Sequence, residues 1–370
     1  MTAYDPGPTT PRAWGWLAHL ESGGTTPWHA WTQPGRVTRP VFPGAQQLQL
    51  LRRINLAGAP STTTAQRVLT ATAGGRGGPA LPLDGAAHPG WGPRPVDPEA
   101  LASGELVRVA ATLLAEDLVA MGVAEPTERP RRWRRRVQLA GDPLAVAHAR
   151  AHLTAAGRLP GGPGARTVVL LASSEVMLSH LWTYRCFGRR VVRWSDWVGR
   201  QSARDRLPAL LDPTRSVPSR TPPRAVRVIT RPDLVTSRGV RAWGLRGVTA
   251  LEAPGADGAE LARRITMVLA GMVPADQVEP LVARTLWRHM PSTAVPPPRV
   301  GVEHRAWLSR VTDRLVGDLG RSGYPVVGDV ADLVPHFATP PPGTGDCDHV
   351  LDLAVAMLAD DRWKHQPRRV

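Results

Sequence analysis

The sequence has almost no lysine and almost no cysteine. Among its 370 residues, Lys364 is the only lysine, and Cys186 and Cys347 are the only cysteines. Two cysteines cannot form the disulfide framework that holds many small secreted domains together, and so few thiols are typical of a reducing compartment. No Cys-x-x-Cys pair occurs, which argues against a structural zinc site.

Signals for export and for membrane insertion are also missing. The first residues, Met1–Pro8, include neither a basic segment nor an apolar segment of the kind found in a secretory signal. No apolar run in the chain approaches the length needed to cross a bilayer. We therefore expect a soluble, cytoplasmic protein with no membrane contact.

Positive charge is abundant, and it comes almost entirely from arginine. The formal net charge is +15. Two explanations are possible: a GC-rich coding sequence, which favours arginine by itself, or a basic face that binds phosphate, sulfate or nucleic acid. The densest run is Arg129–Arg136, which also contains Trp133. It is either a solvated hinge between two domains or a binding segment, whose ligand would be a nucleic-acid backbone, an acidic partner, or a sulfated or phosphorylated glycan. Its candidate anion-binding residues are Arg131, Arg132, Arg134, Arg135 and Arg136.

Residues 1–125 predict a small, mainly helical N-terminal domain. Trp14, Trp16, Trp28 and Trp31 lie among Pro and Gly residues, and we expect them to hold a loop against the core. A short amphipathic helix is predicted over 46–56. The sequence Asp97-Pro98-Glu99 predicts the start of a second helix, which ends near Gly122. A basic linker, residues 126–136, follows this domain.

Residues 137–340 predict an α/β domain with a parallel sheet sandwiched by helices, and residues 341–370 a C-terminal tail. Apolar β-prone runs alternate with helical patterns here, and this order favours parallel strands. The expected strands are 137–140, 167–172, 225–230 and 248–252. The expected helices are 144–156, 175–187, 260–270, 278–289 and 304–320.

The loop after the first expected strand lacks the residues that bind phosphate. In a nucleotide-binding α/β protein, a Gly-rich loop with Lys and Ser or Thr belongs at this position. Here the strand runs into Gly141, Asp142 and Pro143, and the helix that follows contains no Lys, Ser or Thr in its first turn. This absence argues against ordinary nucleotide binding.

Two further segments are distinctive in the order of their residues. In the first, Val168–Ala172 is followed by Trp182 and then by Val192-Arg193-Trp194-Ser195-Asp196-Trp197-Val198. In the second, Val302–Trp307 opens a helix that precedes Gly323–Pro335, with its Gly-Tyr and Gly-Asp pairs. With residues 137–157 as a first block, the chain over roughly residues 137–337 resembles actinobacterial sulfotransferase-like proteins. The resemblance implies a P-loop-type α/β fold.

The resemblance also implies a cofactor site, from which this chain departs. Active members hold the 5′-phosphosulfate of 3′-phosphoadenosine-5′-phosphosulfate with a Lys/Arg-x-Gly-Thr/Ser-Thr loop at a helix N-terminus. At the matching positions Asp142 is negative, and Pro143 has no N–H to donate. The family holds the 3′-phosphate with an Arg and a Ser after the second strand, where this chain has Ser173 and Ser174 but no arginine. These serines are the remaining cofactor-binding candidates.

No metal site and no catalytic residue is predicted. His148 and His152 are four residues apart on one expected helix face, but no third ligand can be assigned. Cys347, Asp348 and His349, with His336 upstream, supply a single thiol, which is little for zinc.

Three functional hypotheses follow. The first is a sulfotransferase-like protein with a degenerate site and no cofactor. It would be a non-catalytic partner or scaffold, for instance of an active sulfotransferase in sulfation or a related biosynthetic pathway. Under this hypothesis Asp142→Ala is expected to leave stability and partner binding intact. The second is an active sulfotransferase that uses 3′-phosphoadenosine-5′-phosphosulfate through an atypical loop and borrows arginines from Arg131–Arg136. The third is a nucleic-acid-binding protein that uses the same arginines.

Overall fold

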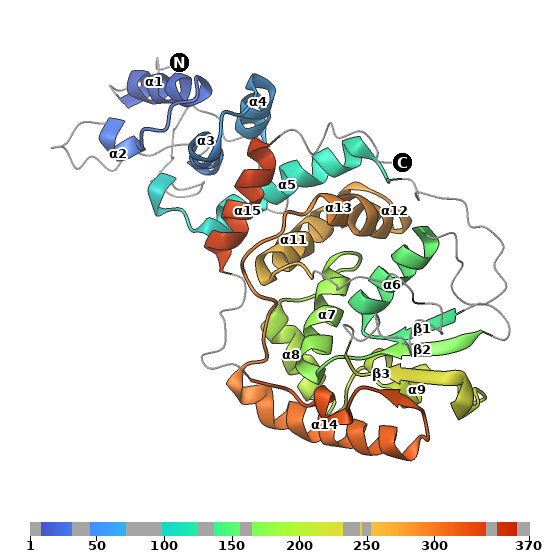
Figure 1. Ribbon diagram of the computed structural model, residues 1–370. Helices are drawn as coiled ribbons and strands as arrows, with labels where there is room; N and C mark the ends of the chain where they lie inside the picture. The colour runs from blue at the N-terminus through green and yellow to red at the C-terminus, as the bar shows by residue number, and fades with distance from the viewer. Residues whose placement is uncertain are drawn as a thin grey trace. The chain divides into compact units, whose positions relative to one another are not determined.

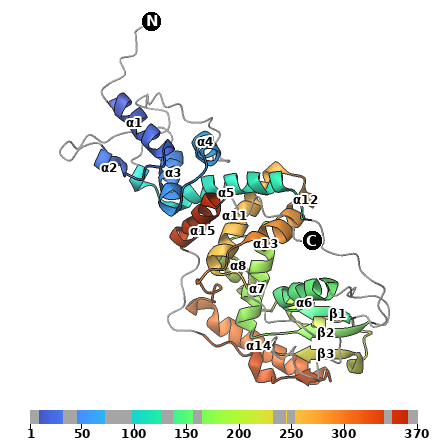
Figure 2. The ribbon, with the colours of Figure 1, turned by 45° about the horizontal axis from the view of Figure 1, so that its top comes forward.

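The computed structural model of the protein divides into two compact units (Figure 1, Figure 2). It describes residues 9–31, 45–71, 98–124, 137–155, 165–231, 245, 253–337 and 346–360. Unit 1 comprises Met1–Val123, Glu260–Pro291 and Asp346–Pro367, and unit 2 comprises Ala124–Ala259, Ser292–Gly345 and Arg368–Val370. Each unit is therefore assembled from segments that are distant in the sequence.

In the described residues of unit 1, all regular secondary structure is helical. Its N-terminal helices are α1 (Thr9–Glu21), α2 (Trp28–Trp31), α3 (Ala45–Ala57), α4 (Thr62–Thr70), the 3-10 turn η1 (Pro98–Ala100) and α5 (Ser103–Met121). The later ones are most of α11 (Ala256–Met272), α12 (Ala275–Pro280), the π-helical η5 (Leu281–Leu286), α13 (Trp287–His289) and α15 (Cys347–Ala359). The helix expected over 278–289 thus contains a π-helical segment, which begins directly after Pro280, a residue that cannot donate to the helical ladder.

Helix α15 packs against α5 and α3, so the expected C-terminal tail contributes to the core of unit 1. Its sequence is apolar enough to bury seven side chains: Val350, Leu351, Leu353, Ala354, Val355, Met357 and Leu358. Residues 260–291, which we expected inside the α/β domain, also belong to unit 1. The expected linker 126–136 lies outside the described residues.

The expected helix start at Asp97-Pro98-Glu99 was wrong. Pro98–Ala100 form only a 3-10 turn, and α5 begins at Ser103. Ala102 precedes α5 with an extended backbone and gives no side-chain cap. At the other end, Gly122 ends the helix as expected, with a φ of 71° that suits glycine.

Two of the N-terminal tryptophans hold unit 1 together, as expected. Trp16 and Trp28 are buried, with ring centroids 5.1 Å apart. Nε1 of Trp16 donates to the carbonyl oxygen of Thr26 at 2.9 Å, which fixes the segment between α1 and α2. The side chains of Trp14 and Trp31 lie outside what the structure describes.

Unit 2 contains a four-stranded parallel sheet, which confirms the expected α/β class. Its strands are β1 (Val137–Gly141), β2 (Arg166–Leu170), β3 (Val226–Ile229) and β4 (Val326–Val327), and their order in the sheet is β1-β2-β3-β4. The first three lie where the apolar runs predicted them. The fourth strand, β4, was not predicted; it directly follows Tyr324 and Pro325. The strand that we expected over 248–252 lies outside the described residues.

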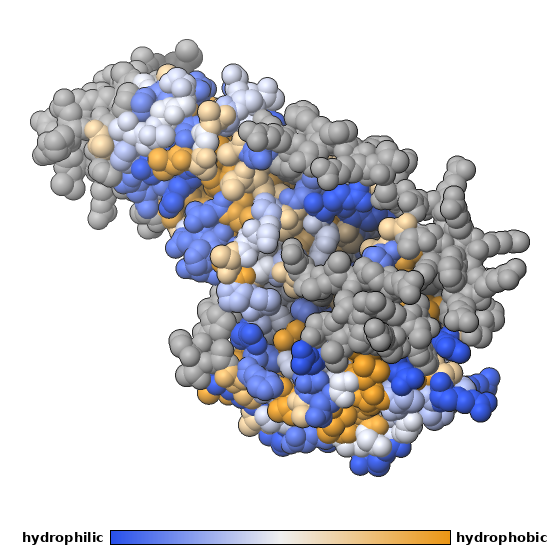
Figure 3. Space-filling model, viewed as in Figure 1, coloured by the Kyte–Doolittle hydropathy of each residue, from blue (hydrophilic) through white to orange (hydrophobic). Residues whose placement is uncertain are grey.

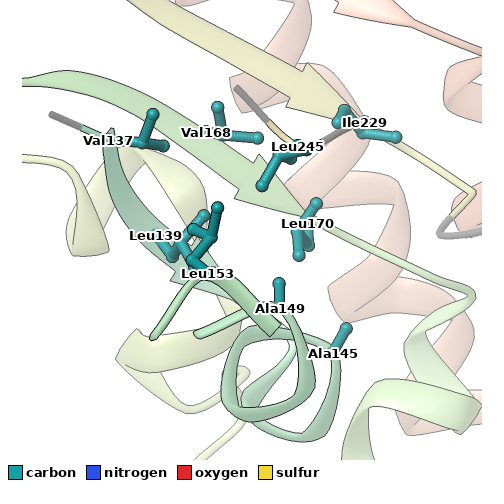
Figure 4. Packing of buried hydrophobic residues seen from close by; sticks show 9 residues of the cluster. All are labelled: Val137, Leu139, Ala145, Ala149, Leu153, Val168, Leu170, Ile229 and Leu245. Carbon is teal, nitrogen blue, oxygen red and sulfur yellow. The ribbon is translucent and has the colours of Figure 1, made fainter. Parts of the chain in front are cut away.

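Helix α6 (Pro143–Ala155) packs on one face of this sheet (Figure 4). Its Ala145, Ala149 and Leu153 recur every fourth residue and therefore share one side of the helix. They meet a buried cluster of strand and loop residues: Val137, Leu139, Val168, Leu170, Ile229 and Leu245. On the opposite face Val169, Val226 and Val228 are also fully buried. Strands β2 and β3 are thus covered on both faces, which explains their almost continuous apolar sequences.

The other helices of unit 2 connect or flank the strands. They are α7 (Ser174–Cys186), α8 (Trp194–Ser202), η2 (Ala209–Leu211), α9 (Pro213–Ser216), η3 (Pro223–Ala225), the start of α11, α14 (Val302–Arg321) and η6 (Val330–Leu333). In α14, Trp307, Val311, Leu315 and Leu319 are buried, as their spacing predicted. Hydrophilic and apolar residues are interspersed on the face of unit 2 that Figure 3 presents. None of the helices in the described part of the chain is long and apolar enough to cross a membrane.

Candidate functional site

The candidate site lies where β1 ends and α6 begins, at the carboxyl edge of the parallel sheet. This edge is where open α/β sheets commonly bind ligands. Gly141 makes the turn with a φ of 103°, and a Cβ added there would approach the carbonyl oxygen of Leu170 to 2.1 Å. Only glycine fits this position, because the backbone passes so close to β2. The tight turn delivers Asp142 to the first turn of α6.

Asp142 caps α6 with its own carboxylate. The side chain is fully buried, and Oδ1 accepts hydrogen bonds from the backbone N–H groups of Leu144 (3.0 Å) and Ala145 (3.1 Å). Pro143 stands at the first helical position, where its missing N–H costs nothing. The positive end of the helix dipole and its free donors normally attract an anion. Here the anion is a side chain of the protein itself.

The second carboxylate oxygen of Asp142 lies next to a histidine that was not among the residues predicted from the sequence. Oδ2 lies 2.6 Å from Nδ1 of His180, which projects from α7 and is 11% exposed. The two residues are 38 positions apart, and neither periodicity nor a known motif links them. Both carboxylate oxygens are therefore engaged within the protein, and the pair ties α6 to α7. Because this carboxylate is buried and bonded on both sides, the structure leads us to expect that Asp142→Ala destabilises the protein, contrary to the expectation from the sequence.

Ser173 and Ser174 follow β2, as predicted, but both hydroxyl groups have structural partners. Oγ of Ser173 caps α7 by accepting from the N–H of Val176 at 3.5 Å, which is a long contact. Oγ of Ser174 is buried and lies 2.6 Å from Oγ1 of Thr312 in α14. The structure brings neither hydroxyl into contact with the carboxylate of Asp142.

Glu175, the next residue, is also committed to the interior. Its side chain is 1% exposed, and Oε2 accepts from Nη1 of Arg299 at 2.9 Å. Oε1 accepts from the backbone N–H of Val300 at 3.1 Å. This pairing anchors the start of α7 to the segment before α14. The start of α7 therefore resembles the start of α6 in having a buried carboxylate with two partners.

The ends of β3 and β4 are joined by a third acidic contact. Oγ1 of Thr230 donates to Oδ2 of Asp332 at 2.9 Å, and the same oxygen accepts from the N–H of Asp329 at 3.0 Å. Asp329 in turn caps η6 through the N–H of Ala331 at 2.9 Å. Along this edge the carboxylates of Asp142, Glu175 and Asp332 are each hydrogen-bonded within the protein.

The arginine cluster expected to bind anions cannot be placed. Arg131, Arg132, Arg134, Arg135 and Arg136 lie outside the described residues. The candidate roles of these arginines remain predictions from the sequence.

Metal ligands do not gather in the described part of the chain. No group of three or more His, Cys, Asp or Glu side chains that could hold a metal ion occurs there. His148 and His152 share α6, and both make other contacts. Cys347 opens α15, where its sulfur lies 3.4 Å from Nη2 of Arg264.

Comparison with known proteins gave no match, whether the chain was set against family models, curated proteins or solved structures. The case for a function therefore depends on the geometry at the sheet edge.

Proposed function

We propose that the protein is a non-catalytic, sulfotransferase-like protein that serves as a partner or scaffold for another protein in sulfation or a related biosynthetic pathway. One observation carries this proposal: the carboxylate of Asp142 fills the helix N-terminus at which a cofactor phosphate would bind. A bound nucleotide would need the same donors. The residues at this position therefore do not fit 3′-phosphoadenosine-5′-phosphosulfate.

The electrostatics of the cap support this exclusion. A phosphate placed at the N-terminus of α6 would meet a buried negative carboxylate, and like charges in a low-dielectric site repel strongly. The N–H groups of Leu144 and Ala145 already donate to Asp142, and Pro143 has none. An incoming anion would have to displace the carboxylate and separate it from His180.

The second anion contact of the family has a similarly different role here. Ser174 bonds Thr312, and Glu175 bonds Arg299 and Val300 inside unit 2. These contacts stabilise the fold where the family would hold a 3′-phosphate. Both replacements convert a ligand-binding position into an internal contact, which supports a structural role for this sheet edge.

A partner for such a scaffold is expected to be acidic. The chain has a formal charge of +15, and a protein with this charge attracts negatively charged surfaces over a distance of about a Debye length. Neither Cys186 nor Cys347 forms a disulfide within the described residues, which supports a reducing compartment such as the cytoplasm.

Calorimetric titration with adenosine 3′,5′-bisphosphate tests the proposal. We expect this desulfated cofactor product to bind the full chain no more tightly than inorganic phosphate at equal ionic strength. An affinity at least about tenfold above that of phosphate would mean that the nucleotide is recognised as a whole. That outcome would overturn the proposal in favour of an active sulfotransferase with an atypical loop.

A matched variant makes the test more specific. If recognition were found, Arg134→Ala with Arg136→Ala would show whether these arginines supply the anion contacts. Binding of DNA or RNA that weakens steeply with added salt would instead favour the nucleic-acid hypothesis. Absence of such binding at low salt would remove it.

A further inference from the structure

Three arginines near the ends of α7 and α8 have no acidic partner in the part of the chain that the structure describes. Arg185 lies in the last turn of α7, Arg189 lies just beyond that helix, and Arg204 lies just beyond α8. Within the described residues, none of these three guanidinium groups forms an ion pair or donates a hydrogen bond. Asp205, the acid next to Arg204, is instead paired with Arg314 at 3.1 Å.

The guanidinium of Arg185 lies over a stack of buried indole rings. Its guanidinium carbon lies 5.8 Å from the centroid of the Trp197 ring, within the range of a cation–π contact. Trp197 stacks on Trp194 at 5.6 Å, and Trp194 meets Trp182 edge-on at 5.7 Å. All three rings are nearly fully buried. Packing against these rings restricts the position of the Arg185 side chain.

Hydrogen bonds fix two of these three rings, while the third has a spare donor. Nε1 of Trp182 donates to the carbonyl oxygen of Val192 at 3.0 Å, and Nε1 of Trp194 donates to that of Arg299 at 2.7 Å. Nε1 of Trp197 is buried without an acceptor in the described structure. The stack therefore presents an unpaired indole N–H as well as an unpaired guanidinium, and buried donors without acceptors are uncommon in stable proteins.

The electrostatics of this cluster are unfavourable without an anion. Burial, together with the positive charges of Arg189 and Arg204, holds the pKa of Arg185 below its usual range. Cations near helix C-termini gain from the helix dipoles, and this gain offsets part of the repulsion. The helix dipoles do not explain why the guanidinium of Arg185 is half-buried while it is repelled by the charges of Arg189 and Arg204. A cluster of like charges with a perturbed group is typical of a ligand site.

We propose that Arg185, Arg189 and Arg204 form a binding site for a tetrahedral dianion, a phosphate or sulfate group. The planar guanidinium of Arg185 can donate two parallel hydrogen bonds to such a group, and the indole stack holds it in position. Arg189 and Arg204 are exposed, and they supply charge at the rim. The indole rings are buried, so they offer no face on which a nucleic-acid base could stack. The anionic group itself is the feature recognised.

This site uses residues other than those at the start of α6, and it does not depend on the proposed scaffold function. The first experiment is calorimetric titration of the full chain with inorganic phosphate and, separately, with sulfate, at pH 7.5 and constant ionic strength. We expect saturable binding of at least one anion, and the tighter one identifies the chemical source of the natural ligand. No binding of either anion would overturn the proposal.

Variants assign the binding to this cluster. We expect Arg185→Gln to lower the affinity for the anion at least about tenfold, because the substitution removes charge-assisted hydrogen bonds. Arg53→Gln, at an exposed arginine of α3 in unit 1, removes the same charge and is expected to leave the affinity unchanged. Equal affinities for the wild type and Arg185→Gln would overturn the proposal.

Thermal unfolding separates a ligand site from a structural role. Without added anion, we expect Arg185→Gln to unfold at the same temperature as the wild type or higher, since repulsion is relieved. Phosphate or sulfate is expected to raise the Tm of the wild type but not that of the variant. If Arg185→Gln fails to fold, the exposed pair Arg189→Gln and Arg204→Gln replaces it. An unchanged anion affinity in that double variant would overturn the proposal.

Discussion

Oδ2 of Asp142 lies 2.6 Å from Nδ1 of His180, although the two residues are 38 positions apart in the chain. One belongs to the turn after β1 and the other to the middle of α7. The contact therefore joins two helices at the edge of the sheet. It also gives the carboxylate that caps α6 a second, independent partner.

Replacing Asp142 is expected to destabilise unit 2 rather than to leave it unchanged. Asp142→Ala removes a helix cap, which costs about 1 kcal/mol, and it leaves His180 without its partner, which costs about 1–3 kcal/mol more. Urea denaturation measures the change. Asp329→Ala, which removes an exposed capping residue from the short η6, is the matched control and is expected to cost less. Equal stability of Asp142→Ala and the wild type would contradict this account of the cap.

The energetic link between Asp142 and His180 can be measured directly. We expect a double-mutant cycle with Asp142→Ala and His180→Ala to give a coupling of about 1–3 kcal/mol, the range for contacting polar groups. The cycle uses the free energies of unfolding of the wild type, both single variants and the double variant. A coupling below about 0.5 kcal/mol would mean that the two residues are neighbours without a stabilising interaction.

The pair formed by Glu175 and Arg299 is expected to respond asymmetrically. Arg299→Met leaves the buried carboxylate of Glu175 without its cation, and loss of one partner from a buried pair costs about 3 kcal/mol. Glu175→Gln should cost less, because an amide oxygen can still accept from Val300 and because Arg299 is 32% exposed to solvent. Chemical denaturation of both variants gives the comparison. A larger cost for Glu175→Gln would show that the guanidinium is the group that requires its partner.

Glu260 in unit 1 is expected to make folding stability depend on acid pH. Burial by itself would raise the pKa of this carboxyl, but hydrogen bonds and charges from Arg263 and Arg264 outweigh burial and lower the pKa. A lowered pKa in the folded state means that the stabilisation is fully present above the unfolded value, about 4.3. It is then lost as the pH falls through the folded value.

Comparison of the wild type with Glu260→Gln checks this pH dependence. We expect the wild type to be more stable by a constant amount at pH 5 to 7, and the difference to shrink below about pH 4.3. Glu279→Gln removes an exposed carboxylate of α12 and serves as the control for the loss of one negative charge. A difference that grew as the pH fell would reverse the sign that the ion pairs imply.

The sequence predicted those parts of the fold that depend on local pattern. Val168, Val169 and Leu170 point alternately to the two faces of the sheet, and all three are apolar because β2 is buried on both faces. Such a continuous apolar run is recognisable without a structure. The spacing of Trp307, Val311, Leu315 and Leu319 likewise indicated one buried helix face. Strand β4 has only two residues, Val326 and Val327, and its pairing with β3 spans about a hundred positions. A strand so short has no periodicity to detect.

The candidate site was predicted only in part. Gly141, Asp142 and Pro143 were recognised as a loop without phosphate-binding residues, which is a local property. The replacement of the missing ligand by the carboxylate of Asp142 depends on the backbone path past Leu170 and on the position of α7. Asx capping could have been inferred from Asp before Pro. The partner His180 could not, because tertiary packing alone brings it there.

The packing of α15 against α5 has a consequence for synthesis on the ribosome. Helix α5 buries eleven residues in the finished protein, yet its partner helix begins only at Cys347. At about 5–20 residues per second, translation takes roughly 10–45 s to proceed from the end of α5 to the start of α15. During that interval the apolar side of α5 is available to chaperones and to other nascent chains. The synthesis of α15 therefore determines when unit 1 can complete its core.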